Sequence, residues 1–272
     1  MPSPAQTAQR PRKLARPATT ALLAEVRSAE QVTPNVRRIT LGGPALADFA
    51  RRGADQWFRL FLPRDDQAEP LLPSTVDWWP ETLAMPDDVR PLVRNYTVRA
   101  ARPELPEIDV DFVLHGDEGP ASRWAGRAVA GDRVGILDQG VTFDPPATAD
   151  WRLVIGDETA LPAVAGILAE SPADVRTLAF VELPTEADAQ PLTVPANTQV
   201  TWLPRPHDTA PGALAVDAVR DQQLPSGAPY AWLAGESAMV RTLRRNLVRE
   251  HGVHKSSITF TGYWRRGVSY YT

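Results

Sequence analysis

Three short stretches of the chain bring together residue types that bind anionic nucleotides. In RNYT, residues 94–97, Arg94, Tyr96 and Thr97 place a guanidinium, an aromatic ring and a hydroxyl on one strand. A guanidinium pairs with phosphate, and the other two groups suit the face and the edge of a flat heterocycle, as in a flavin nucleotide. An exposed strand with ordinary alternation would look the same, so these residues alone leave both interpretations open.

The second stretch is HGDEGPASRWAG, residues 115–126. Gly119 followed by Pro120 predicts the start of a helix, because proline lacks the N–H that a first helical turn leaves unpaired. Ser122 then lies in the first turn, where backbone N–H groups and the helix dipole suit a diphosphate. The alternative is a capped surface helix that packs Trp124 inward.

The third stretch is IGDETALPA, residues 155–163, which ends a buried strand and enters a helix. Ligands of open α/β sheets lie beyond the carboxyl ends of the strands, so Asp157, Glu158 and Thr159 are placed for catalysis. Two acids would repel a pyrophosphate, and no G-x-G-x-x-G turn is present, so we expect this turn to face nicotinamide and flavin rings. In the alternative, Asp157 or Thr159 only caps the helix.

Residues after later strands are expected at the same edge of the sheet. Gly235 and Glu236 close the strand YAWLAGE, and Tyr263 and Trp264 close the last strand before two arginines. We expect Trp264 to lie near the flavin. The alternative makes the aromatic residues a plug between two domains and the arginines surface charge.

The elements that must position these residues change character near residue 144. Before it, short alternating strands predict an antiparallel β-barrel over residues 20–143, behind a flexible basic tail at 1–19. The predicted strands are Leu22–Ala29, Val36–Leu41, Trp57–Leu62, Tyr96–Ala101, Ile108–His115 and Arg133–Leu137. In the Ile108–His115 strand, the face that carries Asp109 and Asp111 is expected to be the wetter one.

After a linker at 144–150, strands alternate with helices, which predicts a doubly wound parallel sheet over residues 151–272. The last long helix is expected to be capped by Ser237 and ended by Gly252. The fold class is therefore a β-barrel followed by an α/β domain. Many flavin reductases resemble this arrangement and have their redox site at the seam between the two domains, so by analogy we expect a site there.

Composition excludes several kinds of chemistry. The chain of 272 residues has no cysteine, which removes thiolate nucleophiles, disulfides, cysteine-bound iron–sulfur clusters and most structural zinc sites. A net charge of −4 disfavours general nucleic-acid binding. The longest apolar-rich stretch, residues 159–169, is shorter than the roughly 18 residues that span a bilayer. We expect no metal site, no stable membrane association, a cytoplasmic location and a monomer.

The motifs RNYTVRA, LHGDEGPASRWA, IGDETALPA, WLAGE with LRRNL, and TGYWRRG resemble the siderophore-interacting protein family in order and spacing. Members are FAD-binding ferric-siderophore reductases related to ferredoxin reductases. The resemblance covers roughly residues 20–267 and implies FAD, with NADH, NADPH or a reduced ferredoxin as electron donor. It implies that FAD is held by Arg94, Tyr96, Thr97, Gly119, Ala121 and Ser122, with His115 as a further contact.

The substrate implied by the resemblance is a ferric siderophore, which is usually anionic and bulky. An acidic protein must concentrate positive charge where such a ligand binds. We expect that role for Arg59 in QWFRLFL, for Arg127, and for Arg265 and Arg266. Two other functions stay open: a flavin reductase or electron-transfer component with a protein or free-flavin acceptor, and a module that binds siderophore or flavin without turnover.

Overall fold

The first half of the chain forms one antiparallel sheet in the computed structural model, which describes residues 17–115 and 119–268. The seven strands run in the order β4-β3-β7-β1-β2-β6-β5. Their bounds are β1 Leu22–Thr33, β2 Val36–Gly42, β3 Trp57–Leu62, β4 Leu92–Thr97, β5 Ala100–Arg102, β6 Glu107–Val113 and β7 Arg133–Asp138. Helices α1 (Trp78–Ala84) and α2 (Pro120–Arg127) and the 3₁₀ helix η1 (Pro44–Asp48) lie in its connections.

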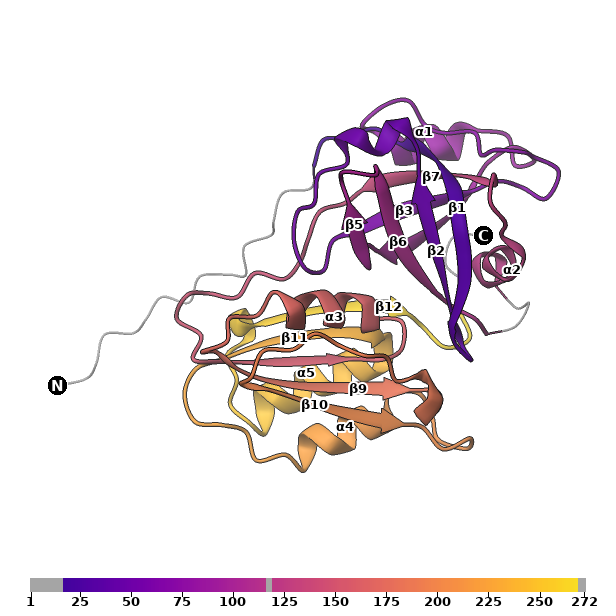
Figure 1. Ribbon diagram of the computed structural model, residues 1–272. Coiled ribbons are helices and arrows are strands. Elements are labelled where there is room, and N and C mark those ends of the chain that lie inside the picture. The colour runs from indigo at the N-terminus through magenta and orange to yellow at the C-terminus, as the bar shows by residue number, and fades with distance from the viewer. Residues whose placement is uncertain (1–16, 116–118, 269–272) are drawn as a thin grey trace.

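Two adjacent residues close this sheet into a barrel (Figure 1). The Val98 N–H donates to the Gln56 carbonyl beside β3, whereas the Arg99 N–H donates to the Asp109 carbonyl of β6. The chain thus passes from one edge of the sheet to the other within two residues. The predicted single strand over Tyr96–Ala101 is wrong for this reason: RNYT ends β4, and β5 begins at Ala100.

Alternation along the strands fills the barrel. Phe58, Leu60 and Leu62 of β3 point into a core to which α2 adds Trp124. The face of β6 that carries Asp109 and Asp111 is wetter than the opposite face by only a small margin at these two residues, which are 8% and 7% exposed, against 0–1% for Ile108, Val110 and Phe112. Arginine partners cover both carboxylates: Arg102 lies 2.6 Å from Asp109, and Arg38 lies 2.6 Å from Asp111.

The second half forms a parallel sheet in the order β10-β9-β8-β11-β12, as a doubly wound domain requires. Its strands are β8 Trp151–Gly156, β9 Arg176–Leu183, β10 Thr198–Pro204, β11 Pro229–Glu236 and β12 Ile258–Trp264. Its helices are α3 Leu161–Ala169, α4 Ala213–Arg220 and α5 Ser237–Arg249, with 3₁₀ helices η2 Glu186–Asp188 and η3 Lys255–Ser257. The predicted fold class is confirmed. Within the described ranges, no helix is long and apolar enough to cross a bilayer.

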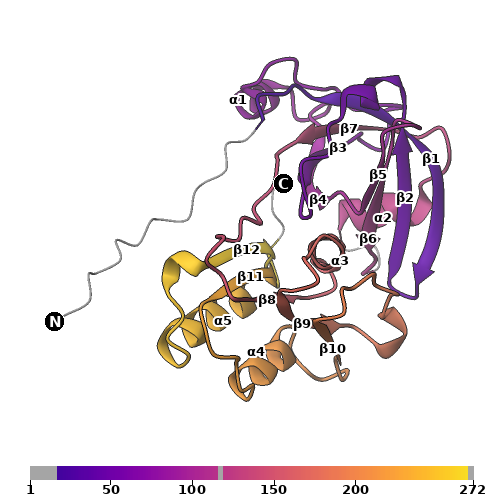
Figure 2. The same cartoon turned by 60° about the vertical axis from the view of Figure 1, so that its left-hand side comes forward.

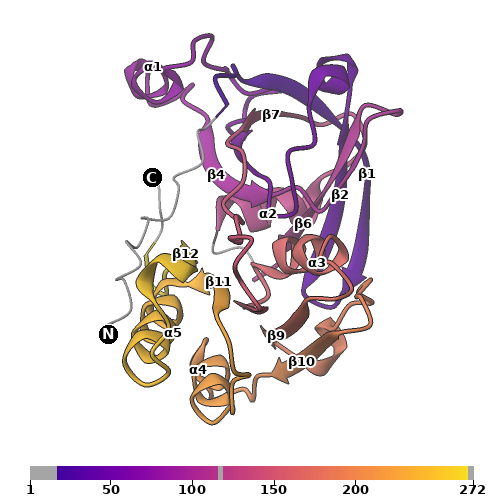
Figure 3. The ribbon, with the colours of Figure 1, turned by 90° about the vertical axis from the view of Figure 1, so that its left-hand side faces the viewer.

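Helix α3 lies between the barrel and the sheet, whereas α4 and α5 cover the opposite face of the sheet (Figures 2 and 3). This position explains its sequence LPAVAGILA, because a helix that is apolar on every side is buried on every side. Gly166 marks the closest approach: an added Cβ would lie 3.1 Å from the carbonyl carbon of Ala54 in the barrel domain, and closer still to its oxygen.

A buried carboxylate also joins the domains. Asp188 in η2 accepts hydrogen bonds from the Thr33 hydroxyl at 2.7 Å and from the Asn35 side-chain amide at 2.8 Å. Both donors belong to the β1–β2 turn. Asp188 has no exposed surface, so the barrel hairpin and the α/β domain share a satisfied polar contact that resists separation.

The start of α5 differs from the prediction. Glu236, not Ser237, caps the helix, since its carboxylate accepts the N–H groups of Ala238 and Met239. Ser237 is the first helical residue, and its hydroxyl donates to the Trp264 carbonyl at 2.8 Å. The expected stop is supported by the backbone, because Gly252 adopts a φ of 66° just beyond the helix.

Candidate functional site

The end of β4 meets the end of β12 at the seam between the domains. Thr97 is buried, and its side chain lies beside the phenol of Tyr263. Burial, with the nearby carboxyl of Asp55, raises the pKa of Tyr263, so this phenol keeps its proton at neutral pH. A residue predicted to contact the flavin is thereby fixed against the second domain.

Tyr96 and Arg94 precede Thr97 in β4. The Tyr96 ring packs 4.2 Å from Phe112, which in turn lies 5.5 Å from Trp124 of α2. Burial raises the pKa of Tyr96. Arg94 is half-buried beside it and donates to the Val93 carbonyl at 2.8 Å. The strand therefore presents a guanidinium next to a rigid aromatic column.

Helix α2 begins where the sequence predicts. Gly119 is its N-cap, and a Cβ there would come within 2.9 Å of the His115 ring. Ser122 is 4% exposed, and its Oγ accepts the His115 backbone N–H at 3.1 Å. Ala121 is buried beneath this turn. His115, Gly119 and Ser122 therefore form one compact turn at the positive end of α2.

A pocket of about 210 Å³ opens beside this turn. Three arginines line it: Arg123 and Arg127 of α2, and Arg64 from the segment after β3. Arg127 is exposed and pairs with Asp65 at 2.5 Å, so part of its charge is already neutralised. Apolar walls come from Leu62, Leu92, Pro63, Pro120 and Trp124. Cationic and apolar groups together suit a phosphate joined to a flat base.

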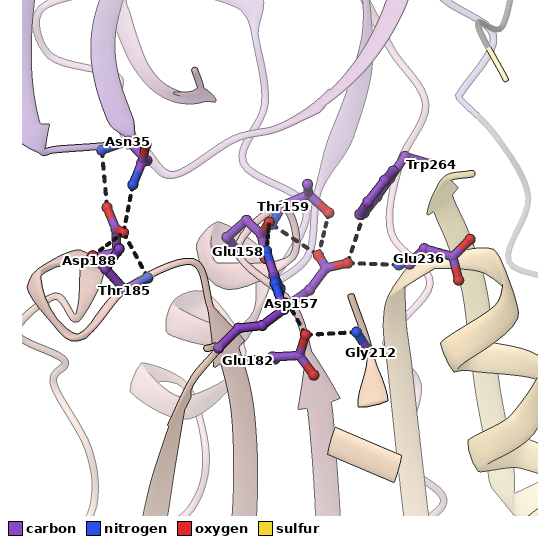
Figure 4. Close-up of polar contacts among 11 residues, drawn as sticks. Asn35, Asp157, Glu158, Thr159, Glu182, Thr185, Asp188, Gly212, Glu236 and Trp264 are labelled. Atoms are coloured by element: carbon purple, nitrogen blue, oxygen red, sulfur yellow. Dashed lines mark hydrogen bonds and ion pairs between the residues drawn. The ribbon is translucent and has the colours of Figure 1, made fainter. Parts of the chain in front are cut away.

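Asp157 fills the crevice between β8 and β11 (Figure 4). It has no exposed surface, and it accepts the Glu236 N–H at 2.7 Å, the Trp264 indole N–H at 2.8 Å and the Thr159 N–H at 3.0 Å. A Cβ on Gly235 would lie 2.5 Å from its Oδ2. Burial raises the pKa of Asp157, and these hydrogen bonds oppose that shift. Asp157 thus positions Trp264 and the start of α5.

Glu158 lies at the same edge, where burial and the neighbouring Asp157 carboxyl raise its pKa to about 7. Its Oε1 lies 3.2 Å from Arg205, whose other nitrogen lies 2.7 Å from Glu182. The sequence prediction missed Arg205 and Glu182. Each stands at the end of a parallel strand, so the rule that selected Asp157 would have found both.

The arginines predicted to bind substrate occupy different environments. Arg59 is 8% exposed, with its guanidinium 5.0 Å from the Trp57 ring and 5.1 Å from the Trp78 ring, and it donates to Asn95. It lies beneath these rings rather than at an open rim. Arg265 and Arg266 are exposed just after Trp264, at the seam. Their roles, like those of the other predicted site residues, stay predictions.

Family models match both halves of the chain: the siderophore-interacting FAD-binding domain over residues 25–143 and the siderophore-interacting protein model over 149–267. The ferric vibriobactin reductase of Vibrio cholerae is 31% identical over 87% of this chain and 86% of its own length. The NADPH-dependent ferric-chelate reductase of Escherichia coli is 30% identical over 86% of this chain and 89% of that protein.

A solved structure described as a siderophore utilization protein from T. fusca superposes with a TM-score of 0.80 at 33% identity. It covers 94% of this chain and 96% of that one. Sequence and fold thus agree over both domains and across the seam between them. The chain belongs to the siderophore-interacting protein family.

Proposed function

We propose that the chain is a flavin-dependent reductase that passes electrons from NAD(P)H through FAD to Fe(III) in a siderophore and releases Fe(II). The observation that carries the proposal is the seam itself. The β4 strand with Arg94, Tyr96 and Thr97 meets the carboxyl edge of the parallel sheet, where the Thr97 side chain lies beside the Tyr263 phenol. Electron donor and acceptor sites need such proximity.

The residues present fit FAD. Arg94 and the pocket arginines Arg64 and Arg123 supply cations for two phosphates, and the first turn of α2 supplies backbone N–H groups. The pocket of about 210 Å³ is smaller than the roughly 300–1,000 Å³ of a complete ligand site. It therefore suits one end of an extended dinucleotide, whose other end would reach the seam.

FAD, when bound, accepts electrons in pairs from a nicotinamide and passes them on singly. The chain's own residues prepare the site for this exchange. Asp157 holds the Trp264 indole at 2.8 Å, which fixes one wall of the seam. Tyr263 and Thr97 close the other side and exclude water from it. Glu158 and Thr159 border the donor side.

The substrate is Fe(III) in an oxygen-rich chelate. Fe(II) is softer and binds hard oxygen ligands less strongly, so reduction makes the metal labile without any protein ligand. Arg265 and Arg266, exposed beside Trp264, would attract an anionic chelate to the seam. Relatives named ferric vibriobactin reductase and ferric-chelate reductase support this class of substrate.

We further infer that the protein is cytoplasmic and monomeric, and that a reduced ferredoxin is an alternative donor. The barrel domain spans residues 20–143 and the α/β domain residues 151–272, joined by a linker at 144–150. The chain between β7 and β8 contains no helix or strand, as a linker requires.

Reduction of the bound flavin tests the proposed donor side. Purified protein loaded with FAD would be mixed under anaerobic conditions with NADH, NADPH or a reduced ferredoxin, and bleaching of the flavin followed by stopped flow. We expect rapid bleaching by a nicotinamide. Protein that binds no FAD, or FAD that none of the three donors reduces, would contradict the proposal.

A further inference from the structure

A largely buried arginine, Arg205, is held between the carboxylates of Glu158 and Glu182 at the carboxyl edge of the parallel sheet. Figure 4 shows both carboxylates at this edge. Arg205 directly follows β10, and its side chain is 13% exposed. One guanidinium nitrogen lies 2.7 Å from Glu182 and another 3.2 Å from Glu158. The positive charge of Arg205 is therefore neutralised by side chains of the same edge.

The two carboxylates are not equivalent. Glu182 is fully buried and also accepts the N–H groups of Gly212 at 2.6 Å and Ala215 at 3.2 Å, so it is fixed at the start of α4. Glu158 uses only its Oε1, because its Oε2 is buried without a hydrogen-bond partner among the described residues. A buried oxygen of this kind costs free energy until a donor reaches it.

The position of these residues has a chemical meaning in dinucleotide-binding sheets. An acid near the end of the second strand accepts the ribose 2′-hydroxyl of NAD, whereas a nearby arginine accommodates the 2′-phosphate of NADP. In this domain β9 is the second strand and carries Glu182, and Arg205 follows the third. Here Glu182 and Arg205 form an ion pair with each other, and Glu158 forms a second ion pair with Arg205.

We propose that Glu158 sets the nucleotide preference of this edge: it holds Arg205 away from a 2′-phosphate and offers its Oε2 to a ribose hydroxyl. The chain then discriminates in favour of NADH over NADPH. This inference rests on the proposed function, since it assumes a nicotinamide donor at this edge.

Electrostatics set the size of the effect. The carboxyls of Glu158 and Glu182 flank the guanidinium of Arg205, and the carboxyl of Asp157 lies near that of Glu158. A 2′-phosphate adds a charge of about −1.5 to −2. At an effective dielectric of about 20, one unit charge within roughly 7 Å changes affinity by tenfold or more. We therefore expect on the order of tenfold weaker binding for a nucleotide that carries the extra phosphate.

Direct binding measures this preference without turnover. The FAD-loaded full chain would be titrated calorimetrically with 5′-AMP and with adenosine 2′,5′-bisphosphate, which differ only in the 2′-phosphate, at pH above 8 and low salt. The test variant is Glu158→Gln. Asp208→Asn is the matched control. Asp208 lies in the β10–α4 connection, as Arg205 does, but its exposed carboxylate does not contact Arg205.

Wild type should bind 5′-AMP on the order of tenfold more tightly than the bisphosphate. Glu158→Gln should erase or reverse that ratio, because it removes one of the two carboxylates that neutralise Arg205, and Asp208→Asn should preserve it. Equal affinities in wild type, or a preference for the bisphosphate as the name of the E. coli relative would suggest, overturn the proposal. So does an unchanged ratio in a folded Glu158→Gln variant.

Arg205→Lys gives a second test, because lysine keeps the positive charge but lacks the guanidinium fork. If Arg205 is sequestered, this change should leave the affinity for the bisphosphate within about twofold, whereas loss of a guanidinium that already contacts the 2′-phosphate in two hydrogen bonds would cost tenfold or more. Failure of the proposed function looks different: neither NADH nor NADPH would bleach the flavin. Reduction by both at equal efficiency, with equal nucleotide affinities, would contradict only the preference.

Discussion

Gly166→Ala tests whether close packing between α3 and the barrel holds the seam together. The added Cβ would lie 3.1 Å from the Ala54 carbonyl carbon and closer to its oxygen, and these are backbone atoms that no rotamer change can move aside. Ordinary carbon contacts lie at about 3.5–4.0 Å, so the helix and the barrel must separate by on the order of 1 Å. Overpacking of this kind costs about 1–3 kcal/mol.

The helix itself would gain from the change, because alanine is favoured over glycine in a helix interior by about 0.5–1 kcal/mol. We expect a net loss of about 1–2 kcal/mol in the free energy of unfolding, measured by urea denaturation. Gly126→Ala is the control, since nothing lies within 4 Å of a Cβ at that position in α2. It should be neutral or slightly stabilising.

The seam gives a second measurement. If α3 moves from the barrel, donor and flavin sides are displaced, so flavin reduction in Gly166→Ala should slow by tenfold or more, since small misplacements are costly. Gly126→Ala should reduce at the wild-type rate. A Gly166→Ala protein with wild-type stability and kinetics would refute the argument that this contact sets the domain geometry.

Three further predictions concern the predicted site residues. The Arg94→Ala variant should lose FAD on purification, measured as the ratio of flavin to protein. If it keeps one FAD per chain, Arg94 does not bind the phosphate. The Arg265→Ala, Arg266→Ala double variant should raise KM for an anionic ferric chelate at low ionic strength while flavin reduction stays unchanged; unaltered kinetics would show that neither arginine binds the chelate. The pKa of Glu158 is about 7 in the folded protein, against an ordinary 4.5. The contribution of Glu158 to the free energy of unfolding is therefore fully present below pH 4.5 and is lost as the pH rises through 7. In urea unfolding, the free energy of unfolding of wild type should fall between pH 5 and 8, and Glu158→Gln should reduce this fall by up to about 3 kcal/mol. If wild type and variant show the same pH dependence, Glu158 is ionised throughout this range.

The fold could be predicted because its strands follow local patterns. The period-two pattern of WFRLFL gave β3 its observed bounds, Trp57–Leu62, and the alternation of strands and helices gave the parallel sheet. Burial of Asp109 and Asp111 could not be predicted in the same way. It depends on arginines from β2 and β5 that reach these carboxylates across the sheet, and spacing along β6 carries no information about them.

The site could be predicted only in part. Strand ends pointed to Asp157 and Glu158, but the pattern did not show that Asp157 is buried behind Trp264 and Glu236. The Thr97–Tyr263 contact joins two domains, and only the packed structure brings its partners together. Capping of α5 by Glu236 was missed because a serine in the next position is the commoner cap.

Electron transfer to iron is the central claim, and one anaerobic measurement addresses it. FAD-loaded protein would be reduced with one equivalent of donor and mixed with a ferric siderophore in the presence of a strong Fe(II) chelator, while flavin absorbance and the Fe(II) complex are followed together. We predict that the flavin is reoxidised as about two Fe(II) form per flavin, because the pair of electrons leaves singly. Flavin that stays reduced beside an intact ferric siderophore, yet is reoxidised at once by free flavin or an electron-transfer protein, would contradict the claim.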